Sequence, residues 1–391
     1  MSGLDFAKAP PPHRPLRWLL TASVWGMVAG VFLLAHGDTT LASRWAPHTV
    51  VLVHLFTLGV LGNAMLGSLL QFLPVAAATP MPLGRSASWL HAAFNLGLAV
   101  FAVSMIHMHR TGLGVASVLL AGPILAFAGA ALPGLLKRGG QQVLRSGIAM
   151  AVIALAVTAV AGAVLVAILR GDAPLPLESI TDAHATVGVL GGVLGLMAAV
   201  GSVTLPMFQG TRHVPERWLG GWVAFTVISL AVGTTLRLYS GLQQPLVVSA
   251  LLPALLFVGI SLWLPLRPLY RRNPTLVWTW RMGTLAVGVA CVITLAGTLS
   301  PLSTRSVLLA GTLVIAIGLP MMLTGMMLEI IGFLAWIGVR RDCPRGMRVP
   351  GVGTLVPDRD KWIVLALQLI AAAALIGAAL TPALLARPAG A

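Results

Sequence analysis

Four histidines lie inside, or at the ends of, segments that are otherwise apolar enough to cross a bilayer: His54, His107, His109 and His184. An imidazole in hydrocarbon needs a polar partner, and ionisable groups at such depth commonly mark functional sites. If successive apolar segments cross in alternate directions, all four histidines fall near one membrane face. Imidazole is a ligand for both haem iron and copper. The pattern therefore predicts a haem or copper site near that face, and ordinary hydrogen-bonded histidines are the alternative.

The composition places these residues in a helical membrane protein. Hydrophobic residues make up 58% of the 391 residues and charged residues only 9%. Continuous apolar runs such as 149–169 fit helices that span ~30 Å of hydrocarbon, whereas the strands of a barrel would alternate. The net charge of +15 is scattered between these runs, so we do not expect a nucleic-acid partner. The sequence predicts an all-α, polytopic membrane helix bundle whose surroundings are the lipid bilayer.

Eleven segments are predicted to span the membrane. They run at roughly 17–37, 47–76, 86–109, 113–136, 145–170, 183–208, 218–238, 244–264, 277–300, 304–338 and 361–385. The run 304–338 contains Pro320 and exceeds a simple span, so it is either one kinked helix or a broken pair, which gives 11 or 12 spans. Residues 1–16 are predicted to form a cytoplasmic tail, and residues 17–391 a single transmembrane domain.

The basic residues predict the orientation of the chain. Only six of the 25 lie on the face shared by the four histidines, and the other 19 lie on the opposite face. The six are Arg44, Arg110, Arg170, Arg237, Arg305 and Arg387. Because basic loops stay on the cytoplasmic side, we expect a cytoplasmic N-terminus and histidines near the outer face. The expected location is a bacterial-type cytoplasmic (inner) membrane, which the chain crosses many times.

His54 and His184 are the first two ligand candidates. His54 lies seven residues inside its span, or ~10 Å deep, and His184 opens the sixth span two residues after Asp182. That carboxylate could orient a ligating imidazole or only cap the helix N-terminus. Arg237, just inside the seventh span, is the guanidinium that we expect to hold a haem propionate. A side chain that merely extends toward the interface is the alternative.

The third span ends in a run that mixes two histidines with two methionines: Met105, His107, Met108 and His109. Residues two apart point ~200° from each other around a helix, so only one of the histidines can face the bundle. We expect His107 to be that ligand and His109 to meet water. Thioethers suit Cu(I), so Met105 and Met108 extend the prediction to copper. An interfacial turn with filler methionines is the alternative.

Glu329 is the one acidic residue within a long apolar run, and it follows Met322 and Met326. A carboxyl group at that depth should be either protonated or paired. One interpretation is a proton- or cation-handling group, with the two methionines on the path to it. A neutral acid that is hydrogen-bonded across helices is the alternative.

The second and sixth spans share a pattern that predicts a weak internal repeat. His54 is followed by Leu73-Pro74, and His184 by Leu205-Pro206. Both spans run from the outer to the inner face, so the repeat is parallel and four helices long, as between transporter halves that are related by an axis along the membrane normal. Leu319-Pro320 suggests a third copy, and chance similarity among apolar helices is the alternative.

The run from His54 to Pro74, the Asp182-Ala183-His184 string and the four-helix periodicity together resemble the haem–copper oxidase subunit I superfamily. The resemblance extends to its relatives without an oxidase centre, such as the NnrS-like haem- and copper-containing membrane proteins. It implies a haem site in which His54 corresponds to the family's second-helix ligand. The seventh and tenth spans lack the histidines that the catalytic oxidases carry there, so an oxygen-reducing centre is not expected.

The leading hypothesis from the sequence is a membrane protein that binds haem b, with copper as a further candidate cofactor. It would act in electron transfer, in nitric-oxide or copper stress, or in oxidase support, with a respiratory complex or another redox partner. Whether it is an enzyme stays open. A transporter that moves copper or a small solute past the outer histidines, the tenth-span methionines and Glu329 is the rival, and an accessory subunit without a cofactor is the third hypothesis.

Overall fold

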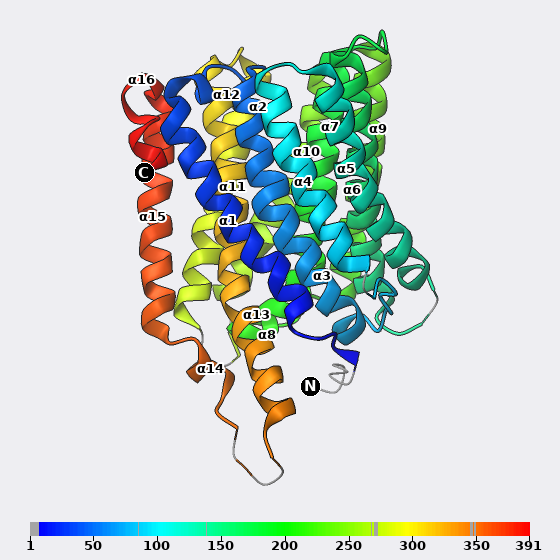
Figure 1. Ribbon diagram of the computed structural model, residues 1–391, viewed down its shortest axis with the longest axis vertical. Helices are drawn as coiled ribbons and strands as arrows, with labels where there is room; N and C mark the ends of the chain where they lie inside the picture. Colours follow the sequence, from blue (N-terminus) through cyan, green and yellow to red (C-terminus); the bar gives the residue numbers. More distant parts are fainter. Residues whose placement is uncertain are drawn as a thin grey trace.

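The computed structural model is a bundle of long helices that run approximately parallel to one another (Figure 1). It describes residues 8–84, 86–137, 139–266, 268–269, 273–344, 347 and 349–391. Within these residues eleven helices are long and apolar enough to cross a membrane, and β-structure is limited to one isolated bridge between Thr211 and Pro268. The prediction of an all-α, polytopic membrane bundle is confirmed.

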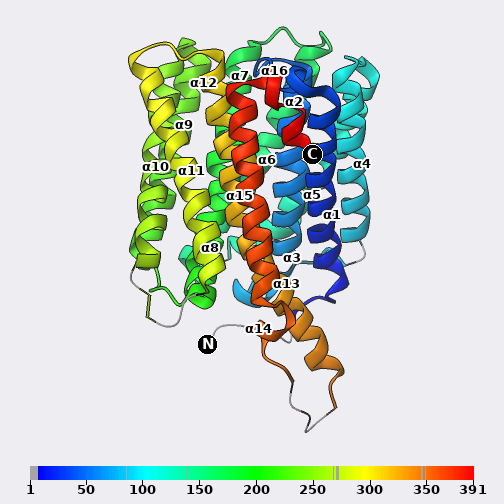
Figure 2. The same cartoon turned by 90° about the vertical axis from the view of Figure 1, so that its left-hand side faces the viewer.

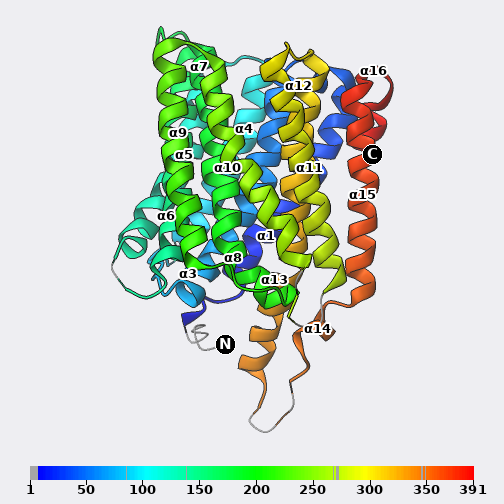
Figure 3. The ribbon, with the colours of Figure 1, turned by 180° about the vertical axis from the view of Figure 1, so that it is seen from behind.

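Eight of the spans are single helices, and their bounds agree with the predicted ones to within a few residues. They are α1 (His13–His36), α4 (Ser86–Ile106), α5 (Arg110–Leu135), α6 (Gln142–Leu169), α9 (Glu216–Ser240), α10 (Gln243–Trp263), α11 (Pro274–Leu299) and α15 (Asp358–Leu380). Seen from behind, α9, α10 and α11 form one side of the bundle (Figure 3). The described chain also contains two short α-helices, α14 (Val352–Leu355) and α16 (Pro382–Leu385), and three 3-10 helices, η2 (Gly37–Leu41), η5 (Leu264–Leu266) and η7 (Pro388–Gly390).

The other three spans are compound helices with a π-helical segment near the middle. They are α2 (Pro47–His54) with η3 (Leu55–Gly62) and α3 (Asn63–Ala76); α7 (Leu177–Thr186) with η4 (Val187–Leu194) and α8 (Gly195–Gln209); and α12 (Thr304–Gly311) with η6 (Thr312–Gly318) and α13 (Leu319–Asp342). In these spans 56%, 56% and 44% of the apolar window is buried, against 33% or less in the others. We call them the inner spans. π-helical segments are rare and are often found at functional sites.

The inner spans recur at intervals of four, as the predicted repeat requires, but only the first two match in detail. Gly62 and Leu194 end their π segments twelve residues before Pro74 and Pro206. In the third inner span Pro320 lies only two residues after the π segment, in the first turn of α13. Because η6 runs into α13 without a break, Pro320 removes an amide hydrogen from inside the span, next to its π segment. Leu319-Pro320 is therefore not the structural equivalent of the other two pairs.

The third inner span is one continuous helix, so the described part of the chain has eleven candidate spans. Its apolar stretch runs through Thr304–Arg340, or 37 residues and ~55 Å at 1.5 Å per residue. That exceeds a hydrocarbon core of ~30 Å. The excess emerges at the end of the bundle where α1 begins, and α13 projects beyond its neighbours there (Figures 1 and 2). We call this the basic end and the other the opposite end, where the described C-terminus packs against α1 (Figure 2).

The sixth span begins earlier than the sequence predicted. The expected start was residue 183, but α7 begins at Leu177, directly after Pro176, and carries Glu178 in its first turn. Acidic residues are favourable in the first turn of a helix because they complement its dipole. His184 therefore does not open the span. It lies seven residues inside α7, just as His54 lies seven residues inside α2.

The orientation of the bundle gives a first prediction. Asp172 is at the opposite end and Cys343 follows α13 at the basic end, whereas Cys291 is buried within α11. If the basic end is cytoplasmic, a membrane-impermeant maleimide added to intact cells should label the cysteine introduced by Asp172→Cys and leave Cys343 unlabelled until the membrane is permeabilised. Cys291 is the internal control and should stay unlabelled throughout. The reverse order of labelling would contradict the orientation.

Candidate functional site

Two imidazoles from different inner spans face each other in the half of the bundle near the opposite end. The ring centroids of His54 and His184 lie 6.2 Å apart, and the ring planes are inclined by 25°. Nδ1 of His54 is 2.7 Å from the carbonyl oxygen of Val50, and Nδ1 of His184 is 3.0 Å from that of Thr158. A carbonyl can only accept, so in each neutral ring the proton is on Nδ1. Nε2 of each ring is then left with a lone pair that can bind a metal.

The surroundings of each ring explain how it is held. Val50 is one turn before His54 in the same helix, so α2 itself orients that ring. His184 is oriented from the neighbouring α6, which approaches closely because glycines face the contact. A Cβ at Gly162 would lie 3.3 Å from Cε1 of His184, and a Cβ at Gly188 would lie only 2.9 Å from Cγ2 of Thr158. Larger residues at either glycine would push α6 away from the ring.

The two rings lie where the accessibility of the inner spans changes. Both histidines are half-buried, and so are the stretches of the inner spans beside them, whereas the stretches toward the basic end are buried throughout. The half-buried stretches are 56–58, 186–189 and 314–316, and the buried stretches are 63–67, 190–197 and 317–323. The inner spans are thus more accessible at the level of the histidine pair than below it.

A buried ion pair lies two residues before His184. Asp182 is 6% exposed, and its Oδ2 accepts from both Nε and Nη2 of Arg237 at 3.0 Å, while its Oδ1 accepts from Nη2 of Arg44 at 3.0 Å. Arg237 also donates to the carbonyl of Gly241. Asp182 therefore neither caps a helix nor orients the ring of His184, the two roles considered from the sequence, because α7 begins five residues earlier. It joins the sixth span to α9 and to the loop before α2.

The histidines after the third span do not join the pair. The helix ends at Ile106 rather than at residue 109, so His107 and Met108 lie in an exposed turn and Met108 has a left-handed backbone (φ 49°). Nδ1 of His109 accepts from the amide of Gly112 at 3.0 Å and caps α5. Met105 is buried. The expectation that His107 faces the bundle was wrong because the span is three residues shorter than predicted.

Other histidines are engaged in packing. His91 bonds through Nε2 to the hydroxyl of Thr21 at 3.0 Å and packs edge-on against Trp18. His36 and His48 form a second ring pair near the opposite end, with centroids 4.8 Å apart. No group of three or more histidine, cysteine, aspartate or glutamate side chains in the described part of the chain could together hold a metal ion. The pair of His54 and His184 is therefore the best ligand set offered by the inner spans.

Glu329 is paired, which is one of the two states expected for a deep carboxyl group. Its Oε1 is 2.6 Å from Nζ of Lys361 and 2.6 Å from Nδ2 of Asn273, so one oxygen joins α13 to α15 and to the start of α11. Met322 also has a partner, because its sulfur accepts from the hydroxyl of Thr284 at 3.3 Å. Met326 lines a cavity instead. These contacts give Glu329 a structural role at the basic end.

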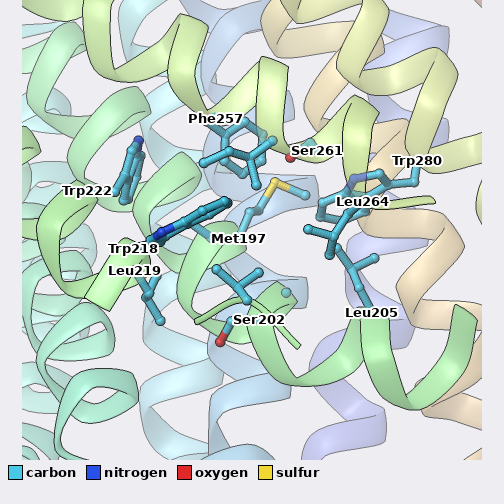
Figure 4. A pocket seen from close by; sticks show the side chains of 14 residues that line it. Met197, Ser202, Leu205, Trp218, Leu219, Trp222, Phe257, Ser261, Leu264 and Trp280 are labelled. Atoms are coloured by element: carbon cyan, nitrogen blue, oxygen red, sulfur yellow. The ribbon is translucent and has the colours of Figure 1, made fainter. Parts of the chain in front are cut away.

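Two cavities lie in the basic half of the bundle, away from the histidine pair. The first encloses about 500 Å³, its mouth included, between α8, α9, α10 and α11. Its walls carry aromatic side chains from three of these helices, namely Trp218, Trp222, Phe257 and Trp280 (Figure 4). The second, of about 900 Å³ with its mouth, lies between the three inner spans. None of the lining side chains of either cavity is ionisable.

The buried ion pair near His184 gives a second prediction. Asp182→Asn should leave Arg237 buried without a counter-charge and lower the free energy of unfolding by about 3–5 kcal/mol, measured by denaturant titration in detergent. Asp172→Asn is the matched control: Asp172 pairs with Arg170 at 2.9 Å but is 53% exposed, so it should change stability by at most about 1 kcal/mol. Equal effects of the two substitutions would show that Asp182 does not anchor the bundle.

The contact between Glu329 and Lys361 gives a third prediction. Glu329→Gln should lower the thermal midpoint by leaving Lys361, which is 5% exposed, without a counter-charge. The double variant Glu329→Leu with Lys361→Met should recover most of that loss, because neither charge then remains buried. If the double variant is as unstable as the sum of its single variants, the pair does not act as a unit.

Comparison with protein-family models, with curated proteins and with solved structures finds no match to this chain. The resemblance to the haem–copper oxidase superfamily therefore stays a prediction from the sequence.

Proposed function

We propose that this multi-pass membrane protein binds one haem b between the second and sixth spans, and that His54 and His184 would hold it. The observation that carries the proposal is the 6.2 Å separation of the two ring centroids. Two imidazoles this close together, carried by two different spans, would be able to hold one metal through their Nε2 atoms.

Three further features support the fit to haem. Each ring donates its Nδ1 proton to a carbonyl, which is the usual second contact of a metal-bound histidine, so Nε2 is the available ligand atom. The inner spans retain accessible surface at this level, which a flat apolar ring could fill. The stretches 56–58 and 186–189, beside the two histidines, carry no charged residue, as suits a macrocycle in a membrane.

The ligand set favours electron transfer over oxygen chemistry. A haem with two histidine ligands supplies one-electron redox chemistry and has no vacant position for oxygen. His54 and His184 would hold the metal from opposite sides. The apolar stretches beside them would exclude water. Because Arg237 already bonds Asp182 and the carbonyl of Gly241, it has few donors left for a propionate, and Arg44, which is 37% exposed, is the better placed guanidinium.

A second candidate uses the same two side chains. Two imidazoles at this spacing could also hold a single Cu(I) ion, for which nitrogen and sulfur donors are suitable ligands. A copper path that continues through Glu329 receives less support, because that carboxylate is bound to Lys361. In either case we propose that the pair lies near the outer face of a bacterial-type inner membrane and serves a redox partner or a respiratory complex.

Removal of one ligand tests the proposal directly. His54→Ala and His184→Ala should each reduce the haem content of the purified protein, and any haem that remains should change from low-spin to high-spin, because only one imidazole is then left to hold the metal. The matched controls are His91→Ala and His109→Ala, which remove imidazoles that are bound to Thr21 and Gly112 and should retain full haem content.

The metal content separates the two candidates. Haem proportional to protein, with loss in both ligand variants, supports the haem site. Copper proportional to protein without haem would replace it with the Cu(I) site. Protein that is purified from haem- and copper-replete cells with its fold intact and neither cofactor would contradict both.

A further inference from the structure

The cavity between α8, α9, α10 and α11 opens beside a pair of partly exposed tryptophans. Trp218 lines it from the first turn of α9 and is 44% exposed. The ring centroid of Trp218 lies 6.3 Å from that of Trp263, the last residue of α10, which is 39% exposed. Partly exposed indoles at the ends of spans are typical of the headgroup level of a membrane. Further inside, Trp222 is 7% and Trp280 only 1% exposed (Figure 4). The cavity, which we call the aromatic cleft, thus leads from the headgroup level at the basic end into the bundle.

The walls of the aromatic cleft suit a hydrocarbon chain. The cleft extends along residues 197–205 of α8, which is ~12 Å of helix, and its surface is mostly apolar. Two of the polar side chains in its walls bond to the protein itself. The hydroxyl of Ser202 donates to the carbonyl of Ala199 at 2.7 Å. Nε1 of Trp222 donates to the carbonyl of Pro253 at 2.9 Å. An apolar occupant therefore leaves both of these groups satisfied.

Charged residues flank the cleft at its basic end. Three arginines lie within two residues of a lining residue in the sequence: Arg212, Arg217 and Arg281. Glu216 is the one carboxylate placed in the same way. Arg212 and Arg217 are exposed. Nη2 of Arg281 lies 3.5 Å from the carbonyl oxygen of Pro265 in η5, a segment that forms part of the wall. The surroundings of the mouth therefore carry a net positive charge.

Backbone contacts bring the loops that flank the cleft to one edge. The amide of Leu269 donates to the carbonyl of Gly210 at 2.7 Å, and Thr211 forms an isolated bridge with Pro268. The loop before α9 is thus tied to the segment after η5, so Arg212 lies at the same edge as the guanidinium that α11 places beside η5. Basic pockets between helices at the cytoplasmic end of a bundle are typical binding sites for anionic lipid headgroups.

We propose that the aromatic cleft binds one molecule of an anionic phospholipid. One acyl chain enters the cleft and packs against its aromatic and aliphatic walls, while the phosphate is held at the mouth by the guanidinium groups of Arg212, Arg217 and Arg281. An apolar cleft that opens at headgroup level beside basic residues matches both parts of such a lipid. The site shares no residue with the histidine pair and does not depend on haem, so its test is independent of the proposal above.

Native mass spectrometry of the purified full-length protein, titrated in detergent with phosphatidylglycerol, tests the proposal. Arg212→Gln combined with Arg217→Gln should weaken binding of the first lipid about thirtyfold, because each basic residue beside an anionic headgroup contributes about fivefold. The matched control, Arg14→Gln combined with Arg17→Gln, removes two charges from the first turns of α1, on the other side of the bundle (Figure 2), and should bind like the unmodified protein.

A second variant tests the cleft itself. A Cβ at Gly201 would lie 3.5 Å from Cη2 of Trp280, which is an ordinary contact, so Gly201→Leu should fold and place its side chain in the cleft. It should weaken binding of phosphatidylglycerol about tenfold by displacing part of the acyl chain. The thermal midpoint without lipid shows whether the variant is folded, and the arginine variants decide the test if it is not.

Two further ligands separate the sources of binding. Phosphatidylcholine with the same acyl chains should bind the unmodified protein at least tenfold more weakly than phosphatidylglycerol, because its headgroup has no net charge. Glycerol phosphate, which has no acyl chain, should not bind measurably. Equal affinity for the two lipids, equal affinity of the two double arginine variants, or binding of glycerol phosphate as tight as that of the lipid would overturn the proposal.

Discussion

An imidazole placed inside a bilayer must bond through both of its nitrogens, and this constraint organises the candidate site. In His54 and His184 one nitrogen of each ring is bonded within the fold, because each Nδ1 donates to a backbone carbonyl. Nε2 of each ring keeps its lone pair, and the two ring centroids lie 6.2 Å apart. A metal between them would satisfy both lone pairs at once. Histidines that only pack and form hydrogen bonds would not need to lie so close together.

The inner spans create the conditions for that pair. Each one changes from α- to π-helical geometry close to the level of the histidines. In each one, the residues toward the opposite end are more accessible than those toward the basic end. Ion pairs fix the spans on either side of this region. Asp182 joins the sixth span to Arg237 of α9 and to Arg44, and Glu329 joins the tenth span to Lys361 of α15. The candidate site thus lies between two buried ion pairs, those of Asp182 and Glu329, that hold the helices together.

The eleven spans could be predicted because long apolar runs between basic loops leave few alternatives in a membrane. The histidines could be predicted for the same reason, and the sequence predicts that His54 and His184 share one site with His107. The depth of His184 could not be predicted, because the acidic Glu178 and Asp182 made the first turns of α7, which begins at Leu177, look like part of a loop. The exposure of His107 followed from a helix that ends at Ile106.

Low-temperature electron paramagnetic resonance of the oxidised, purified protein tests the central claim most directly, because it reports the ligands of the iron rather than its presence alone. Ligation by two histidines fills every coordination position and predicts a low-spin ferric signal that accounts for one haem in each chain. A high-spin signal, which indicates an iron with a vacant or water-bound position, would contradict the pairing of His54 with His184. So would a low-spin signal that persists unchanged when either of these histidines is replaced.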